Sequence, residues 1–424
     1  MRRLPIIMCL LALCLALCAC GDKPAERKSD LPPLHLAVAS DLHYLSQQLT
    51  DNGPLFQELV ARGDGKLMLD IDQITEAFVD QMIVERPDVL ILSGDLSFNG
   101  EYQSHADLAE KLMRIRDAGI PVLVLPGNHD IAVSRTFRFE GEGYEPVRNT
   151  SADEFRELYK DFGYRQALSV DDCSGSYVYE VRSDLRIIML DTNSYITNLF
   201  PEKSLSWLEK QLKAAKKAGA GVITVSHQNL LLHNSLFSSG YRISNGMELE
   251  LLLKKYQVVA NLSGHMHIQH LMDDGIPEVL TSPLSLVPCR WGSLCWDVSG
   301  LSYEAKSVDV AAWAEKQGLL DEHLLHFADY ASESFYQNSY RQILDSFAAS
   351  GLSAETVERM ACCFAETNLA YFTGENLDRE KLSAELDFWV QAAGEGLETA
   401  YLRSILQDES PSPLIIQLWE RESG

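Results

Sequence analysis

The chain has 424 residues, of which 46% are hydrophobic and 23% are charged. This composition is typical of a folded protein with a sizeable core, and it excludes collagen-like, low-complexity and disordered chains. The net charge is −25, from 36 basic and 61 acidic residues. Since no run of Lys or Arg offers a basic face, the sequence also excludes a protein that holds nucleic acid by neutralising its phosphates.

The N-terminus has the pattern of a secretory signal. Two arginines precede an apolar run over residues 4–19, and a polar, proline-containing segment follows. The run is too short to span a bilayer comfortably. Residues 17–20 read Leu-Cys-Ala-Cys and resemble the lipobox of bacterial lipoproteins, which implies lipidation of Cys20. We therefore expect an exported protein of the cell envelope, lipid-anchored at the outer face of the cytoplasmic membrane or in the periplasm. An ordinary cleaved signal is the alternative.

Short apolar runs alternate with helical periodicity through the first two thirds of the chain. The predicted strands are 34–40, 88–93, 121–126, 185–190, 221–226 and 258–263. The predicted helices between them are 71–86, 102–118, 204–217 and 247–256. Because the strands are apolar along their whole length and are separated by helices, they predict an α/β fold with sheet buried on both faces.

Residues of metal-ligand type follow five of these strands. The clusters are Asp41-Leu42-His43, Gly94-Asp95, Gly127-Asn128-His129-Asp130, His227 and Gly264-His265-Met266-His267. Ligand sites of open α/β sheets lie at the carboxyl ends of the strands. Carboxylate, imidazole and amide ligands suit Mn, Fe or Zn, and this set is large enough for two divalent ions that share a carboxylate. Any one of these residues alone could simply cap the next helix.

In this order the five clusters resemble the signature DxH…GD…GNH[DE]…H…GHxH of the calcineurin-like metallophosphoesterases. The similarity covers residues 34 to about 311 and implies a four-layer αββα sandwich. It implies one ion held by Asp41, His43 and His267, a second held by Asn128, His227 and His265, and Asp95 as the bridge. His129 matches the histidine that assists the leaving group, and Asp130 would orient it. Gln228-Asn229 replaces the prolines of many relatives, which would alter the pocket wall but not the ligand set.

The resemblance implies metal-dependent phosphoester hydrolysis. Two divalent ions would polarise the phosphoryl oxygens and lower the pKa of a bridging water, so that hydroxide attacks in line. Protonated His129 would assist the departing alkoxide. We expect a small phosphoester as the partner, either a phosphodiester or a nucleotide-like phosphoester. The alternatives are a phosphomonoesterase acting on proteins or small metabolites, and a partner-binding surface lipoprotein whose metal site is structural.

Residues 131–177 form a long excursion between the third and fourth strands, rich in Arg, Glu and aromatic residues. Its length predicts a functional lid. Arg135 and Arg138 could clamp a phosphate or stack on a base, although pairing with the nearby glutamates is the alternative. Asn99, after the bridging Asp95, and Asn229, after His227, are two further candidate substrate contacts.

Strand-like segments at 294–298 and 302–310 precede a helical C-terminal part. Periodicity predicts helices over 319–335, 340–348, 354–367 and 381–405, with Ser353 as an N-cap and Gly351 as a helix stop. The many aromatic residues favour a bundle packed on itself or on the catalytic domain, and the acidic faces argue against a membrane role. We therefore expect a signal at 1–20, a linker at 21–33, a metallophosphoesterase domain at 34–311 and an all-helical domain at 312–424.

Five cysteines follow Cys20 at irregular spacing: Cys173, Cys289, Cys295, Cys362 and Cys363. An odd number without a regular pattern predicts free thiols rather than a disulfide framework. A bridge between Cys289 and Cys295 stays open.

Overall fold

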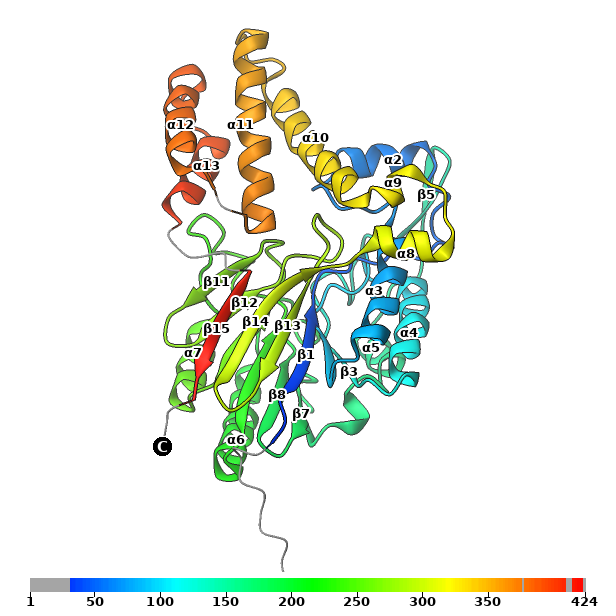
Figure 1. Cartoon of the computed structure of the whole chain (residues 1–424), viewed down its shortest axis with the longest axis vertical. Helices are drawn as coiled ribbons and strands as arrows, with labels where there is room; N and C mark the ends of the chain where they lie inside the picture. The colour runs from blue at the N-terminus through cyan, green and yellow to red at the C-terminus, as the bar shows by residue number, and fades with distance from the viewer. Residues whose placement is uncertain (1–30, 376, 409–413, 422–424) are drawn as a thin grey trace, which may run out of the picture.

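The computed structural model describes residues 31–375, 377–408 and 414–421 (Figure 1). The predicted signal and Cys20 lie outside the described residues, as does most of the predicted linker. Within the described part of the chain, no helix has the length and apolar composition that crossing a membrane requires.

Two β-sheets form the centre of the molecule. The strands of the first sheet are β1 (Leu34–Ala39), β2 (Val89–Leu92), β3 (Val122–Val124), β13 (Arg290–Trp296), β14 (Gly300–Ser307) and β15 (Ile415–Glu420). They lie in the order β15-β14-β13-β1-β2-β3. The strands of the second sheet are β6 (Ser169–Val170), β7 (Tyr177–Arg182), β8 (Leu185–Leu190), β9 (Gly221–Ser226), β10 (Ala260–Ser263), β11 (His270–Asp273) and β12 (Pro277–Leu280). Their order is β11-β12-β10-β9-β8-β7-β6.

Alternating side chains on each strand build the layers, because successive residues of a strand point to opposite faces. In β8, Ile187 and Met189 join the core between the two sheets. Ile188 and Leu190 instead pack with helices α6 (Glu202–Ala218) and α7 (Gly246–Lys255). Helices α3 (Ile71–Glu85) and α4 (Tyr102–Asp117) cover the outer face of the first sheet in the same way. The four-layer αββα sandwich is confirmed.

The four helices predicted between the strands are confirmed to within about two residues at each end. The 131–177 excursion differs from the expected loop because it has structure of its own. It contains the hairpin β4 (Phe137–Glu140) and β5 (Gly143–Pro146), helix α5 (Ala152–Leu158), the short helix η2 (Tyr164–Gln166) and β6. Ser151 and Glu154 close α5 with a reciprocal capping box, which is why a helix starts there.

The helical region consists of α8 (Val310–Gln317), α9 (Glu322–Leu325), α10 (Phe327–Phe347), α11 (Ala354–Thr373), α12 (Arg379–Ala393) and α13 (Leu397–Gln407). Ser353 caps α11 as predicted, since its side chain accepts a hydrogen bond from the Thr356 amide. Helix α10 runs through the gap expected at 336–339. The single helix expected over 381–405 is two helices, because α12 ends at Gly394, whose φ of 78° is left-handed.

The C-terminal segment corrects the all-helical expectation. Strand β15 returns to the first sheet and pairs antiparallel with β14. Leu418 enters the core between the sheets, and Trp419 stacks on Trp296 with ring centroids 5.4 Å apart. Pairing with β14 and packing of Leu418 and Trp419 on the core between the sheets therefore hold this segment as a strand. In Figure 1 β15 lies beside β14, far from α12 and α13.

The cysteines at positions 173, 289, 295, 362 and 363 are free. No disulfide joins Cys289 to Cys295, and the prediction of free thiols is confirmed for the described residues.

Glu278 on β12 holds the loop that follows β9. Its carboxylate accepts hydrogen bonds from the amides of Leu230 and Leu231 at 2.8 and 2.6 Å, and it also accepts one from each of two neighbouring side chains, Asn261 and Ser263. His233 Nε2 lies 3.2 Å from the same carboxylate. Burial alone would raise the pKa of Glu278, but the hydrogen bonds and His233 outweigh it and lower that pKa. The ionised carboxylate is thus an anchor for the loop.

We expect Glu278→Ala to lower the free energy of unfolding by about 3–5 kcal/mol, because it leaves His233 and two amides buried without their partner. Denaturant unfolding measures the change, with Glu304→Ala on the exposed part of β14 as the control. A loss below about 1 kcal/mol would contradict the anchoring role.

Candidate metal centre

The five predicted clusters meet at one end of the two sheets, below the helices α10 to α13 (Figure 1). Two overlapping groups of side chains place one potential ligand atom each within 4.8 Å of one another. The first group is Asp41, His43, Asp95 and His267, and the second is Asp95, His227 and His265. Asp95 is common to both groups.

The backbone is left-handed at five of these six residues. The φ angles are 53° at Asp41, 46° at His43, 49° at Asp95, 69° at His265 and 60° at His267. Such a φ costs on the order of 1–3 kcal/mol for a residue other than glycine and persists only where the surroundings impose it. Here the loops hold one another: the amides of Asp41 and His43 donate to the carbonyls of Gly94 and Asp95. Hydrogen bonds between the loops therefore hold the ligand residues in this backbone conformation.

Two glycines of the motifs are required because neighbouring loops approach their Cα atoms too closely for a side chain. A Cβ on Gly127 would lie 2.1 Å from Asp95 Oδ1, and one on Gly264 would lie 1.8 Å from Ser40 Oγ. Any side chain at either position would push the ligand loops apart. This accounts for the glycine that precedes Asn128 and the one that precedes His265.

The first group contains a buried oxygen that a cation would satisfy. Asp41 Oδ2 accepts a hydrogen bond from the His265 amide at 3.0 Å. Asp41 Oδ1 is buried without a hydrogen-bond partner among the described residues and lies 3.3 Å from His267 Nε2. His43 Nε2 faces His267 Nε2 at 3.3 Å. A carboxylate oxygen and two ring nitrogens that converge on one point fit a divalent transition metal ion.

In the second group, one ring nitrogen of His227 points its lone pair toward two oxygen atoms. His227 Nδ1 donates to the Ser93 carbonyl at 3.0 Å, which leaves Nε2 without its proton in the neutral ring. That Nε2 lies 3.2 Å from Asp95 Oδ2 and 3.1 Å from Asn128 Oδ1. Burial opposes a charge on His227, but Asp95 and Asp41 outweigh it and raise its pKa to about 9. The pocket thus draws positive charge to the point where an ion would sit.

His265 is suited to bind as a neutral imidazole. Its Nε2 donates to the Gly240 carbonyl at 3.0 Å, which leaves Nδ1 for an ion. Burial and the neighbouring His227 lower the pKa of His265 to about 4. Since a metal binds the deprotonated ring nitrogen, this environment favours ligation near neutral pH.

His129 lies over the first group, with its ring 4.9 Å from that of His43. Its amide donates to Asp95 Oδ1 at 2.8 Å. Its Nδ1 lies 3.0 Å from both the Phe98 carbonyl and Asn99 Oδ1, which are acceptors for a proton on that nitrogen. Asn99 is therefore placed to orient His129, so that Nε2 is the ring nitrogen left for a reacting group.

Asp130 does not have the orienting role expected of it. Its buried carboxylate accepts hydrogen bonds from the amides of Leu96, Ser97 and Gly127 at 3.1, 2.8 and 2.7 Å. It ties together the loops that follow β2 and β3, and the His129 ring is held by other groups.

Three of the weaker substrate candidates do not line the cavity above the metal ligands. The Arg138 guanidinium is 3.2 Å from Glu140 and 3.8 Å from Glu145, as the alternative reading expected. Arg135 is exposed on the same excursion. Asn229 is buried and donates to the Gly264 carbonyl at 3.0 Å, so that it supports the His265 loop from beneath. The structure does not bring any of these three to the cavity described next.

A cavity of about 800 Å³ opens above the metal ligands. Its floor contains Asp95, Asn128, His265 and His267, with His129 beside them. Its walls come from the loop 236–241 and from α10, α11 and α13. Among the described residues that line it, none comes from 131–177. The residues that cover the site therefore come from the helical region and the loop 236–241, and a lid formed by 131–177 stays a prediction.

Two charged lining residues, Asp64 and Lys66, belong to no motif. Their loop follows α2 (Pro54–Ala61), and Asp64 Oδ2 lies 4.0 Å from His267 Nδ1. The Lys66 ammonium pairs with Asp64, and burial together with Lys66 lowers the pKa of His43. Nothing in the local sequence indicates this role, because the loop owes its place to a distant helix.

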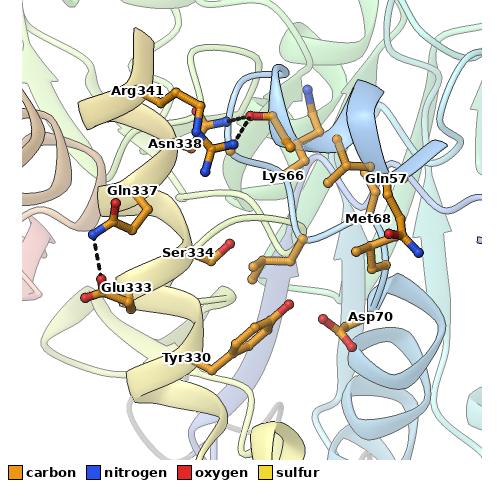
Figure 2. A pocket seen from close by; sticks show the side chains of 15 residues that line it. Gln57, Lys66, Met68, Asp70, Tyr330, Glu333, Ser334, Gln337, Asn338 and Arg341 are labelled. Atoms are coloured by element: carbon orange, nitrogen blue, oxygen red, sulfur yellow. Dashed lines mark hydrogen bonds between the residues drawn. The ribbon is translucent and has the colours of Figure 1, made fainter. Parts of the chain in front are cut away.

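That helix is α10, which lies along a groove of about 360 Å³ beside the loop (Figure 2). Asn338 and Arg341 donate to the Ala61 carbonyl at 3.1 and 3.4 Å, and Gln342 donates to the Gly63 carbonyl at 3.2 Å. A Cβ on Gly65 would lie 2.7 Å from the Phe335 ring. Helix α10 therefore packs close enough to set the position of Asp64 and Lys66.

Comparison with known families matches both parts of the chain. The model of the calcineurin-like phosphoesterase family matches residues 34–269. A second model, described as the C-terminal domain of cyclic nucleotide phosphodiesterase, matches residues 309–411.

Two curated proteins are similar over the catalytic part. Proteins named probable cyclic nucleotide phosphodiesterases from Fibrobacter succinogenes and a Synechococcus species are each 24% identical, over 251 and 252 residues. The matches cover 55% and 57% of this chain and 84% and 80% of those proteins. A solved structure of a dimetal phosphatase from Danio rerio aligns with a TM-score of 0.47 at 13% identity, over 65% of this chain and 96% of that one.

Removal of the shared carboxylate tests the centre directly. We expect Asp95→Asn to lower the bound Mn or Zn by more than half, because it removes negative charge from both ligand groups. Elemental analysis after dialysis measures the metal content, and Asp345→Asn on exposed α10 is the control. Metal content equal to that of the wild type would contradict the position given to Asp95.

Proposed function

This chain belongs to the calcineurin-like phosphoesterase family, and we propose that it hydrolyses cyclic phosphodiesters of nucleotides with two divalent ions. Family membership and the buried Asp/His cluster make it a metal-dependent phosphoester hydrolase. The names of the two curated relatives and the match of the C-terminal region support the choice of a cyclic nucleotide. The single observation that supports two ions rather than one is that Asp95 belongs to both ligand groups.

One set of residues would hold the ions, and a second set would serve the leaving group. Asp41, His43 and His267 would hold one ion and Asn128, His227 and His265 the other, with Asp95 between them. When bound, the ions supply Lewis acidity that polarises a phosphoryl oxygen and lowers the pKa of water. His129 faces the same space with Nε2, while Asn99 and the Phe98 carbonyl receive the proton on Nδ1. A doubly protonated His129 can therefore give its Nε2 proton to the leaving alkoxide and stay correctly oriented.

A comparison of substrates separates this proposal from its alternative. We expect turnover of bis(p-nitrophenyl) phosphate and of adenosine 3′,5′-cyclic phosphate by the purified protein with Mn or Zn, and loss of turnover with chelator. A clear preference for p-nitrophenyl phosphate would favour the phosphomonoesterase instead. No turnover of a folded, metal-loaded protein on any of these substrates would favour the partner-binding lipoprotein.

His129→Ala tests the proton donor. We expect the variant to keep its metal and to lose about 10²–10⁴-fold in kcat on the cyclic nucleotide, whose alkoxide is a poor leaving group. The loss on bis(p-nitrophenyl) phosphate should be much smaller, because nitrophenolate leaves without a proton. Asn99→Ala should show the same pattern more weakly, since it removes only an acceptor for Nδ1. An equal loss on both substrates would remove the acid role.

The proposal places this activity in the cell envelope. The arginines, the apolar run and Cys20 of the N-terminal segment support export and lipidation, and the net charge of −25 supports a small anionic substrate rather than nucleic acid. We expect Cys20→Ser to move the protein from the membrane fraction to the soluble fraction, as measured by fractionation and immunoblotting. A variant that still sediments with membranes would rule out Cys20 as the anchor.

A further inference from the structure

The cavity above the metal centre has a polar end and an aromatic end. The polar end consists of the metal ligands, His129, Asp64 and Lys66. The aromatic end is formed by Phe237 and Tyr241 from the loop after β9 and by Phe364, Tyr371, Phe372 and Tyr401 from the helical region. Since one continuous cavity joins the two ends, a molecule bound at the metal ligands has its other half among aromatic rings.

These rings form a row that starts at a metal ligand. The ring of Tyr241 lies 5.3 Å from that of His265, and Phe237 lies 5.1 Å from Tyr241. Tyr401 lies 5.9 Å from Phe237, and Phe364 lies 5.7 Å from Tyr401. Phe237, Tyr241 and Tyr401 are only half-buried, so their rings are partly open to the cavity.

We propose that the helical region and Phe237 form a subsite for the nucleobase of the substrate, and thereby give α10, α11 and α13 a role in specificity. This inference rests on the proposed function, because it names the group attached to the phosphate at that same site. A planar base stacks on aromatic rings, whose faces accept any π-system. The carboxylate of Glu398 belongs to a residue of the same lining and is a polar group for the edge of a base.

The rings of the subsite are held in place by hydrogen bonds. The Tyr401 hydroxyl donates to Asn368 Oδ1 at 2.6 Å, and Asn368 Nδ2 donates to Ser339 Oγ at 2.9 Å. Asn234 Nδ2, from the loop after β9, donates to the Tyr371 hydroxyl at 3.1 Å. The two parts of the chain are thus joined at the aromatic end, and a base would meet walls that are already formed.

The charge of the lining limits the substrate to one phosphoryl group. Lys66 is the single lysine or arginine among the described residues that line the cavity, while Asp64, Asp95 and Glu398 are acidic. A di- or triphosphate would lack partners for its additional charges. The volume of about 800 Å³ is within the usual range for a ligand of drug size. A nucleoside with a single cyclic phosphate fits both limits. A lipid phosphodiester would fit the volume but would not use the ring faces.

Binding of adenosine tests the subsite without turnover. Adenosine lacks a phosphate, so its binding to chelator-treated protein reports the base and the ribose without the phosphoryl group. We expect saturation-transfer NMR to show contact with the adenine protons and Phe237→Ala to weaken binding about tenfold. Phe237→Tyr, which keeps a ring, should remain within about threefold of the wild type. Tyr340→Ala removes a ring that stacks on Tyr336 outside the cavity and serves as the matched control.

Catalysis gives the second measurement. Phe237→Ala should raise the KM for adenosine 3′,5′-cyclic phosphate about tenfold and change kcat much less, because the ring of Tyr241 separates Phe237 from the metal ligand His265. Failure of adenosine to bind the wild type, or equal binding by Phe237→Ala, would overturn the subsite even if cyclic nucleotides are hydrolysed. Faster hydrolysis of a short-chain phosphatidylcholine than of the cyclic nucleotide would also overturn it. Adenosine binding without any metal-dependent turnover would instead keep the subsite and refute the proposed function.

Discussion

Asp95 must lie within reach of two groups of imidazoles at once, and much of the structure serves that requirement. Its Oδ2 is 3.8 Å from His43 Nε2 and 3.2 Å from His227 Nε2, and these histidines come from different sheets. Burial would favour the neutral acid, but His227 and His129 outweigh it and hold the pKa of Asp95 well below its usual range. The carboxylate therefore stays charged between the two sheets, where a pair of cations needs a shared anion.

The conformational strain that this arrangement requires is distributed over the loops that carry the ligands. Five ligand residues have left-handed backbone, and two glycines allow contacts that any Cβ would block. Short buried strands on both sides carry these loops, and β1, β2, β3 and β9 each contribute apolar side chains to two cores. A rigid, doubly covered sheet is what lets strained loops persist at its carboxyl edge.

The helical region completes the site rather than standing apart from it. Helix α10 holds the Asp64 and Lys66 loop through the Ala61 and Gly63 carbonyls, and α11 and α13 form walls of the cavity. This arrangement also explains how a negatively charged protein can bind a negatively charged substrate. The protein is strongly acidic, yet distant surface charges are screened beyond about 8 Å at physiological salt. Cations held by the Asp/His cluster, together with Lys66 in the cavity lining, would act on a phosphoryl group at much shorter range, so an acidic protein could bind an anion there.

The ligand clusters could be read from the sequence because each one is local. A short apolar run followed by Asp, Asn or His predicts a buried strand with a ligand residue at its carboxyl end, wherever that strand lies in the sheet. Five such runs in a fixed order are specific enough to predict the fold. The αββα layers followed from strands that are apolar on both faces. The start of α11 could be predicted from Ser353, since an N-cap depends only on contacts with the first turn of its own helix.

Only the tertiary structure decided which residues surround the ligands. Asn99 rather than Asp130 accepts from His129, because the ring turns toward the loop after β2 and not toward its own neighbour in the chain. Asp64 and Lys66 reach the centre because α10 holds the preceding residues Ala61 and Gly63 through hydrogen bonds that join positions 277 and 279 residues apart in the sequence. Strand β15 leaves the helical region because its side chains complete a core begun by β1 and β13. The sequence by itself determined the strand ends and the metal-ligand types, whereas contacts between distant segments determined the cover, the orientation of His129 and the shape of the cavity. Local patterns carry no information about which distant surface will pack against them.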